Sequence, residues 1–191
     1  MTSDSGERRI FDLFDDLEGQ AEALYAAERE AELTDRSRAE YATVTLTSRL
    51  MASLQRPVTL EIVGAGRASG TLSRVGTGWC VLEGAPSSWL VPVEAIVMAE
   101  GLSDRSLPEV AWPAVARLGL GSALRRLADD RSPCVVHLRT GASHEVVLTR
   151  VGADFVEVAP TAGAVRRVLL TVTSIAAVQA QASAEATASA R

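Results

Sequence analysis

The chain has 191 residues, of which 47% are hydrophobic and 23% are charged, and its net charge at pH 7 is −5. This length allows one or two domains with buried cores, and the apolar content excludes a wholly disordered chain. No apolar run approaches the length of about 18 residues that a membrane-spanning helix needs, and the polar start of the sequence lacks the pattern of a signal peptide. We therefore expect a cytoplasmic protein with no membrane association.

Residues 1–55 predict an acidic helical segment. Apolar residues recur there at alternating steps of four and three, which is typical of an amphipathic helix or a short coiled coil. Two interpretations stay open, a helix that packs on its own domain and a seam that joins two copies in a homodimer. Ser37 and Glu40 have capping-box spacing, so we expect a second helix from Ser37 to about Leu54, although one long helix with an exposed turn also fits. The candidate dimer or partner-helix residues are Ile10, Phe14, Leu17 and Leu24.

The sequence between residues 69 and 99 occurs a second time, about 76 positions later. A repeat of this size indicates one supersecondary unit copied in tandem. The matched positions are Leu72 with Leu148, Arg74 with Arg150, Gly76 with Gly152, Trp79 with Phe155 and, after a slip of three residues, Leu90 with Leu169 and Ile96 with Ile175.

Each copy predicts about five short strands that follow a helix and an X-Pro pair, and in the first copy the alternation over residues 58–63 predicts the first of these strands. Short strands separated by glycine at close spacing are typical of a small closed barrel. We therefore expect an α+β fold, with an N-terminal helical hairpin followed by two pseudo-repeated five-stranded barrels, each preceded by a helix. The expected limits are 1–55 for the helical segment, 56–103 for the first barrel, 104–131 for a linker and helix, 132–179 for the second barrel and 180–191 for a disordered tail.

The apolar skeleton of the first copy resembles that of Sm-like and SH3-like small barrels. It comprises Gly70, Leu72 and Val75, then Trp79 and Leu82, and the closing run WLVPVEAI. The whole chain also resembles a group of actinobacterial proteins, some of which are labelled Fis-type regulators. The resemblance implies a barrel that recognises a protein partner or RNA.

The polar groups with which Sm proteins read RNA are missing from this sequence. Gly76 stands where the Sm motif has an aspartate, and Cys80 stands where it has the asparagine of the RNA pocket. The departure favours protein binding over RNA binding, because a fold alone does not carry a function.

Residues for catalysis or metal binding form no recognisable pattern. Cys80 and Cys134 lack zinc or redox spacing, and His137 and His144 have no acidic cluster beside them in the sequence. No nucleophile–base motif is present either. We therefore expect no enzyme activity, no cofactor and no metal.

Three residues are candidates for contact with a partner. Trp89 has no aromatic counterpart in the second copy, so it is a candidate anchor for a protein. Arg125 and Arg126 follow a Leu-Gly turn that resembles the helix-turn-helix of Fis-type proteins, so they are candidate nucleic-acid contacts. The sequence thus predicts a non-enzymatic protein-binding adaptor or scaffold, and its alternative is a nucleic-acid-binding regulator.

Overall fold

The computed structural model describes residues 25, 29–30, 32–161 and 167–181. The chain divides into two compact units, Met1–Val44 and Thr45–Arg191. In the first unit, residues 32–42 are helical, so Ser37 lies inside a helix and the expectation that a helix begins there is wrong. Four predicted seam residues lie outside the described part of the chain: Ile10, Phe14, Leu17 and Leu24.

The second unit opens with helix α2 (Leu46–Met51). A capping box formed by Thr45 and Ser48 lies at the start of this helix. The backbone N–H of Ser48 donates to Thr45 Oγ1 at 3.1 Å, and the N–H of Thr45 donates to Ser48 Oγ at 3.2 Å. These bonds satisfy backbone donors that a helix start leaves without partners. The helix then places Leu50 and Met51 in the core.

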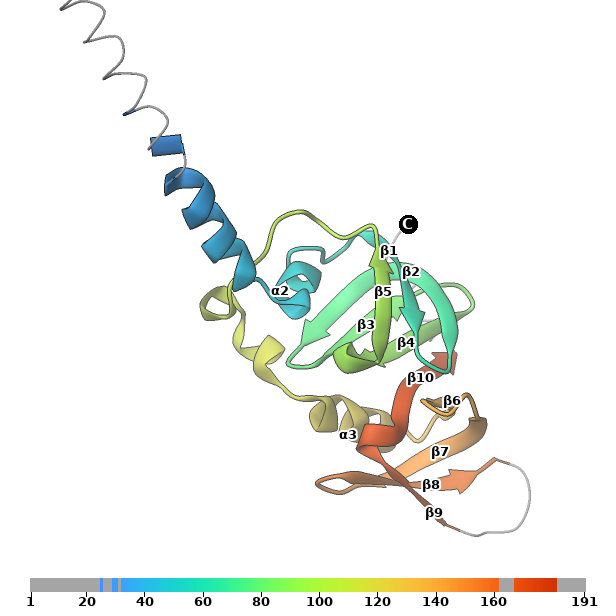
Figure 1. The fold of residues 1–191 in the computed structure, drawn as a ribbon. Helices are drawn as coiled ribbons and strands as arrows, with labels where there is room; N and C mark the ends of the chain where they lie inside the picture. Colours follow the sequence, from blue (N-terminus) through green and yellow to red (C-terminus); the bar gives the residue numbers. More distant parts are fainter. Residues whose placement is uncertain (1–24, 26–28, 31, 162–166, 182–191) are drawn as a thin grey trace, which may run out of the picture. The chain divides into compact units, whose positions relative to one another are not determined.

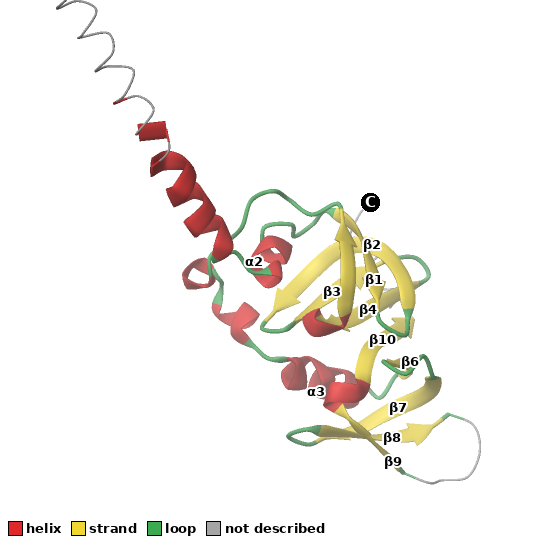
Figure 2. Ribbon diagram, viewed as in Figure 1, coloured by secondary structure: helices red, strands yellow, loops and turns green. Residues whose placement is uncertain are grey.

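The strands of the second unit form one antiparallel sheet (Figures 1 and 2). They are β1 (Pro57–Ile62), β2 (Gly66–Gly76), β3 (Trp79–Glu83), β4 (Ser87–Pro92), β5 (Ile96–Glu100), β6 (Pro133–Leu138), β7 (Ser143–Val151), β8 (Phe155–Pro160), β9 (Val168–Thr171) and β10 (Ile175–Gln181). Helix α3 (Leu120–Asp130) and four 3-10 turns, η1 (Val93–Ala95), η2 (Glu109–Ala111), η3 (Ala114–Arg117) and η4 (Val172–Ser174), complete the described elements.

The expected pair of five-stranded barrels behind a helical hairpin is wrong. The strand order is β5-β1-β2-β3-β4-β10-β6-β7-β8-β9, so the ten strands form one open sheet. The joint lies between β4 and β10, where Leu90 pairs with Val178 and Trp89 with Gln179. Pairing these strands satisfies backbone groups that two separate sheets would leave on their edges. The sequence could not reveal this, because a strand has the same two-residue period in a barrel and at a joint.

The two halves of the sheet repeat each other in register. The β2–β3 pairing shifts between Leu72 and Arg74, and the β7–β8 pairing shifts between Leu148 and Arg150. The helix-to-strand connection repeats as well, since Gln55 and Arg131 both have positive φ, 64° and 50°. Each such residue precedes the first strand of its half by two positions.

The described residues of the unit form two apolar cores, and each core takes residues from both halves. Trp79 and Leu90 of the first half pack with Leu124 and Val136 of the second. Ala176 and Ala177 of β10 pack in the other core, among first-half residues: Leu60, Leu72, Leu82 and Val91. The joint is therefore continuous with both cores. Within the described residues, no helix is both long enough and apolar enough to cross a membrane.

Candidate functional site

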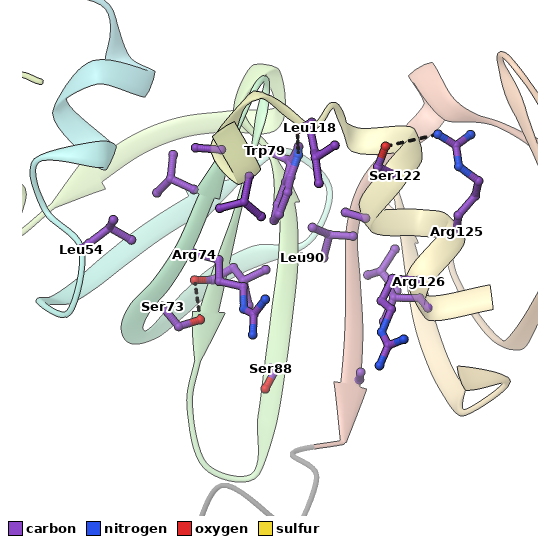
Figure 3. Close-up of a pocket in the computed structure, with 18 of the residues that line it drawn as sticks. Leu54, Ser73, Arg74, Trp79, Ser88, Leu90, Leu118, Ser122, Arg125 and Arg126 are labelled. Atoms are coloured by element: carbon purple, nitrogen blue, oxygen red, sulfur yellow. Dashed lines mark hydrogen bonds between the residues drawn. The ribbon is translucent and has the colours of Figure 1, made fainter. Parts of the chain in front are cut away.

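An apolar groove of about 800 Å³ lies between the sheet and α3, and we call it the α3 groove. One wall is α3 with the residues before it, and the other is formed by β2, β3, β4 and β10 (Figure 3). Its apolar lining includes Val75, Trp79, Val81, Leu90, Leu118 and Leu127. The groove is therefore built from segments far apart in the sequence.

Hydrogen bonds hold the segment before α3 against the turn between β2 and β3. The Trp79 indole N–H donates to the carbonyl of Leu118 at 2.7 Å, and the backbone N–H of Thr77 donates to the same carbonyl at 3.3 Å. Thr77 also forms an isolated bridge with Gly119, which is the residue before α3. Both walls of the groove are thus connected at this end by hydrogen bonds within the chain.

Helix α3 turns one face to the core and another to the groove. Leu124 and Ala128 are buried, whereas Arg125 and Arg126 are exposed. The Arg125 guanidinium donates to Ser122 Oγ at 3.2 Å, and Arg126 lies 3.8 Å from the carboxylate of Asp130. An ion pair of such length between exposed groups contributes little to stability, so the guanidinium of Arg126 can exchange partners.

The charged residues at the groove are mostly basic. Arg74 on β2, together with Arg125 and Arg126 on α3, lines the groove, against one acidic residue, Asp129. Figure 3 shows Arg74 on the sheet side, Arg126 on the helix side and Leu90 between them. An apolar floor with guanidinium groups at its rim suits a ligand that carries both apolar groups and carboxylates.

The predicted site residues separate into two places. Arg125 and Arg126 lie at the groove, where Arg74 joins them. Trp89 lies on β4, half-buried, and its ring stacks on His137 with centroids 5.2 Å apart and planes at 25°. In the stretch that resembles a helix-turn-helix, the element before α3 is the 3-10 turn η3. No α-helix directly precedes α3 there, as a helix-turn-helix would require.

The groove also contains residues that were not among the predicted site residues, such as Arg74 and Leu118. Arg74 belongs to the internal repeat, in which it matches Arg150, but the repeat alone does not indicate that Arg74 lines a groove. Leu118 is 48% exposed and lies between two elements, where hydrophobic periodicity carries no signal.

The two thiols and the histidines lie apart from the groove lining. Burial raises the pKa of the Cys80 thiol to about 12. Burial also raises the pKa of Cys134, to about 11, although a hydrogen bond from the Leu148 backbone opposes the shift. The ring Nε2 of His137 lies 3.1 Å from Gln179 Oε1. No group of three or more His, Cys, Asp or Glu residues in the described ranges is placed to hold a metal ion.

No protein-family model matches the chain, and a comparison with curated proteins finds no match. The geometry and chemistry of the α3 groove are therefore the observations that point to a function.

Proposed function

We propose that this chain is a non-enzymatic protein-binding adaptor whose α3 groove holds a segment of a partner protein. The observation that carries the proposal is the apolar groove of about 800 Å³ with Arg74, Arg125 and Arg126 at its rim. The partner segment would place apolar side chains on the floor and carboxylates beside the arginines. An amphipathic helix with acidic residues next to its apolar face has this chemistry.

Size and preorganisation support the proposal. The volume lies in the range of about 300–1,000 Å³ that is usual for binding pockets. The hydrogen bonds of Trp79 and Thr77 to Leu118 already fix the wall of the groove, so binding would cost little ordering entropy there. The arginines add specificity and a faster encounter with an acidic partner.

Binding of nucleic acid by Arg125 and Arg126 is the rival function. Carboxylates near a phosphate site repel the phosphates, and Asp129 and Asp130 lie on the same helix as the two arginines. The apolar floor between Arg74 and Arg126 also has no role in holding phosphates. Both features favour the peptide.

The test is a titration of the full chain with labelled synthetic peptides, followed by fluorescence anisotropy. The peptides are an acidic amphipathic helix, a basic amphipathic helix of the same apolar pattern and a scrambled acidic peptide; a DNA duplex and a single-stranded RNA serve as further probes. We expect the acidic amphipathic peptide to bind most tightly. Preference for the nucleic acids, with affinity that falls steeply as salt rises, would overturn the proposal in favour of the rival.

Charge reversal locates the binding. Arg126→Glu and Arg74→Glu are expected to weaken the acidic peptide about fivefold to tenfold each, as for the loss of one charge pair at a partly dry site. Arg117→Glu is the matched control, because Arg117 is exposed on η3 and does not line the groove. Equal losses in all three variants would show general charge attraction instead of a groove.

A homodimer through the heptad positions Ile10, Phe14, Leu17 and Leu24 is part of this proposal. It rests on the sequence pattern, because these residues lie outside the described ranges. Light scattering of the full chain and of a Leu17→Arg variant tests it. At tens of micromolar, where the weaker strand contact proposed below is little populated, we expect the wild-type dimer to become a monomer in the variant, and a monomeric wild type would remove the seam.

A further inference from the structure

The sheet ends at two strands that have a partner on one side only. Strand β5 pairs with β1, and β9 pairs with β8; among the described strands nothing pairs with their outer sides. Such edges present backbone N–H and C=O groups that can pair with another strand. The outer edges of β5 and β9 are therefore candidate sites for pairing with a further strand.

The joint between β4 and β10 shows which strand fits these edges. By the internal repeat, β4 is the equivalent of the edge strand β9, and β10 is the equivalent of the edge strand β5. Strand β5 pairs with β1 in the register in which β10 pairs with β6: Leu60 is opposite Ala99, and Val136 is opposite Val178. Strand β9 pairs with β8 as β4 pairs with β3. Within the chain, β4 pairs with β10. The equivalent pair is β9 with β5, and these two strands lie at opposite ends of one sheet.

Burial differs sharply between the joint and the free edges. Leu90 on β4 is 6% exposed, whereas its equivalent on β9, Leu169, is 63% exposed. Ala176 on β10 is fully buried, whereas its equivalent on β5, Val97, is 65% exposed. The neighbouring Met98 on β5 and Val168 on β9 are also exposed, at 42% and 41%. Apolar side chains at positions that are buried or half-buried along the joint are thus left in water at both ends of the sheet.

We propose that β9 of one copy pairs antiparallel with β5 of a second copy, in the register of the internal joint. Ala99 then lies opposite Leu169, and Glu100 lies opposite Val168. The contact repeats a β-strand pairing that this fold already accommodates and removes exposed apolar area from water. The occupant of each edge is therefore a second copy of this chain.

The contact is head-to-tail, so it does not close on itself in a dimer. A pair of copies still has one unpaired β5 and one unpaired β9. The number of copies in an assembly therefore rises as the protein concentration rises, unless the rotation between neighbouring copies closes a ring. This behaviour distinguishes it from the N-terminal seam, which joins two equivalent helices and ends at a dimer.

The experiment is analytical ultracentrifugation of the full chain in a concentration series up to about 500 µM, where a contact with a Kd of about 100 µM is well populated. We compare wild type with Leu169→Lys on β9 and Val97→Lys on β5. Both positions are exposed in the single chain, so the lysine disturbs the edge and not the core. Val110→Lys, at a position on η2 that is 85% exposed, is the control.

We expect wild type and Val110→Lys to form species larger than a dimer, and each edge variant to need at least about tenfold higher concentration to assemble, since a lysine on an edge opposes strand pairing. A mixture of the two edge variants gives the sharpest result. Leu169→Lys retains an intact β5 and Val97→Lys retains an intact β9, so with Leu17→Arg added to both chains to remove the N-terminal seam, the mixture should form one heterodimeric contact and go no further.

Three outcomes would overturn the proposal. They are a wild type that does not assemble at any concentration in the series, assembly that neither edge variant weakens, and a mixture that associates no better than its components. Loss of assembly in Leu17→Arg alone would assign it to the N-terminal seam. Circular dichroism of each variant checks that the sheet remains folded.

Discussion

The indole of Trp79 occupies the space that a side chain on residue 76 would need. A Cβ on Gly76 would lie 2.4 Å from Cε2 of the Trp79 ring, and a Cβ on Gly152 would lie 2.5 Å from Cε1 of the Phe155 ring. In each half, a glycine before the turn thus lets an aromatic ring cover the strand. The first of these rings also lines the α3 groove.

Gly76→Ala is expected to destabilise the protein by about 1–3 kcal/mol, because the methyl group must displace the buried ring. Urea unfolding followed by circular dichroism measures this. Gly121→Ala is the matched control: its Cβ would meet only the end of the Arg125 side chain, at 3.7 Å, inside helix α3. There we expect stabilisation of about 0.5–1 kcal/mol from helix propensity, and a loss of equal size in both variants would contradict the packing argument.

Trp79→Phe removes the hydrogen bond from the indole to Leu118. We expect a loss of about 1–3 kcal/mol and faster amide exchange in residues 114–119, because the groove wall loses an anchor. Hydrogen-exchange mass spectrometry measures the local effect. Trp112→Phe removes a similar bond, from Trp112 Nε1 to the Leu107 carbonyl at 2.8 Å, and should leave exchange in residues 114–119 much less changed.

Thr45→Ala removes the hydroxyl of the capping box at the start of α2. We expect the free energy of unfolding to fall by about 1 kcal/mol, since an N-cap substitution of this kind usually costs that amount. Thr47→Ala, inside the same helix, is the comparison and should change stability by less than about 0.5 kcal/mol. Chemical denaturation of both variants provides the measurement, and equal effects would argue against a capping role.

The buried thiols predict a loss of stability at alkaline pH. In the unfolded chain the Cys80 thiol has its ordinary pKa of 9.0, and burial raises it to about 12 in the folded protein. The unfolded chain therefore releases this proton first, so stability is unaffected by it well below pH 9 and falls as pH rises from about 9 towards about 12. The chain has no lysine to titrate in this window.

Urea unfolding at about pH 8 and about pH 10.5 measures the effect, and Cys80→Ala should reduce the difference between the two. Ellman's reagent gives an independent readout, since only the thiolate of an accessible cysteine reacts. At neutral pH we expect both thiols to react only after unfolding. Rapid reaction in the folded protein would show that Cys80 and Cys134 are not protected.

Local features of the fold could be predicted because they depend on neighbouring residues. The alternation of Val58, Leu60 and Ile62 predicts β1, and the structure places β1 at Pro57–Ile62. The same kind of local pattern predicted a helix start at Ser37, and this prediction was wrong. Capping-box spacing also occurs by chance inside helices, and the box that does form is the one at Thr45.

The long-range arrangement needed the structure. Leu90 and Val178 read as ordinary strand residues, and nothing in either segment indicates that they pair with each other. The α3 groove was hidden for the same reason, because Arg74 and Arg126 lie on elements that only the folded chain brings together.

The position of β10 has a consequence for biosynthesis. It is the last of the ten strands to leave the ribosome, yet it lies between β4 and β6 in the middle of the sheet. Ile175 and Val178 complete one core, and Ala176 and Ala177 complete the other. Until these residues emerge, β4 and β6 each lack a partner on one side, and both cores are unfinished. Exposed strand edges and apolar surface of this kind make a nascent chain prone to aggregation. Translation that stalls just before Ile175 would therefore yield a product that depends on chaperones.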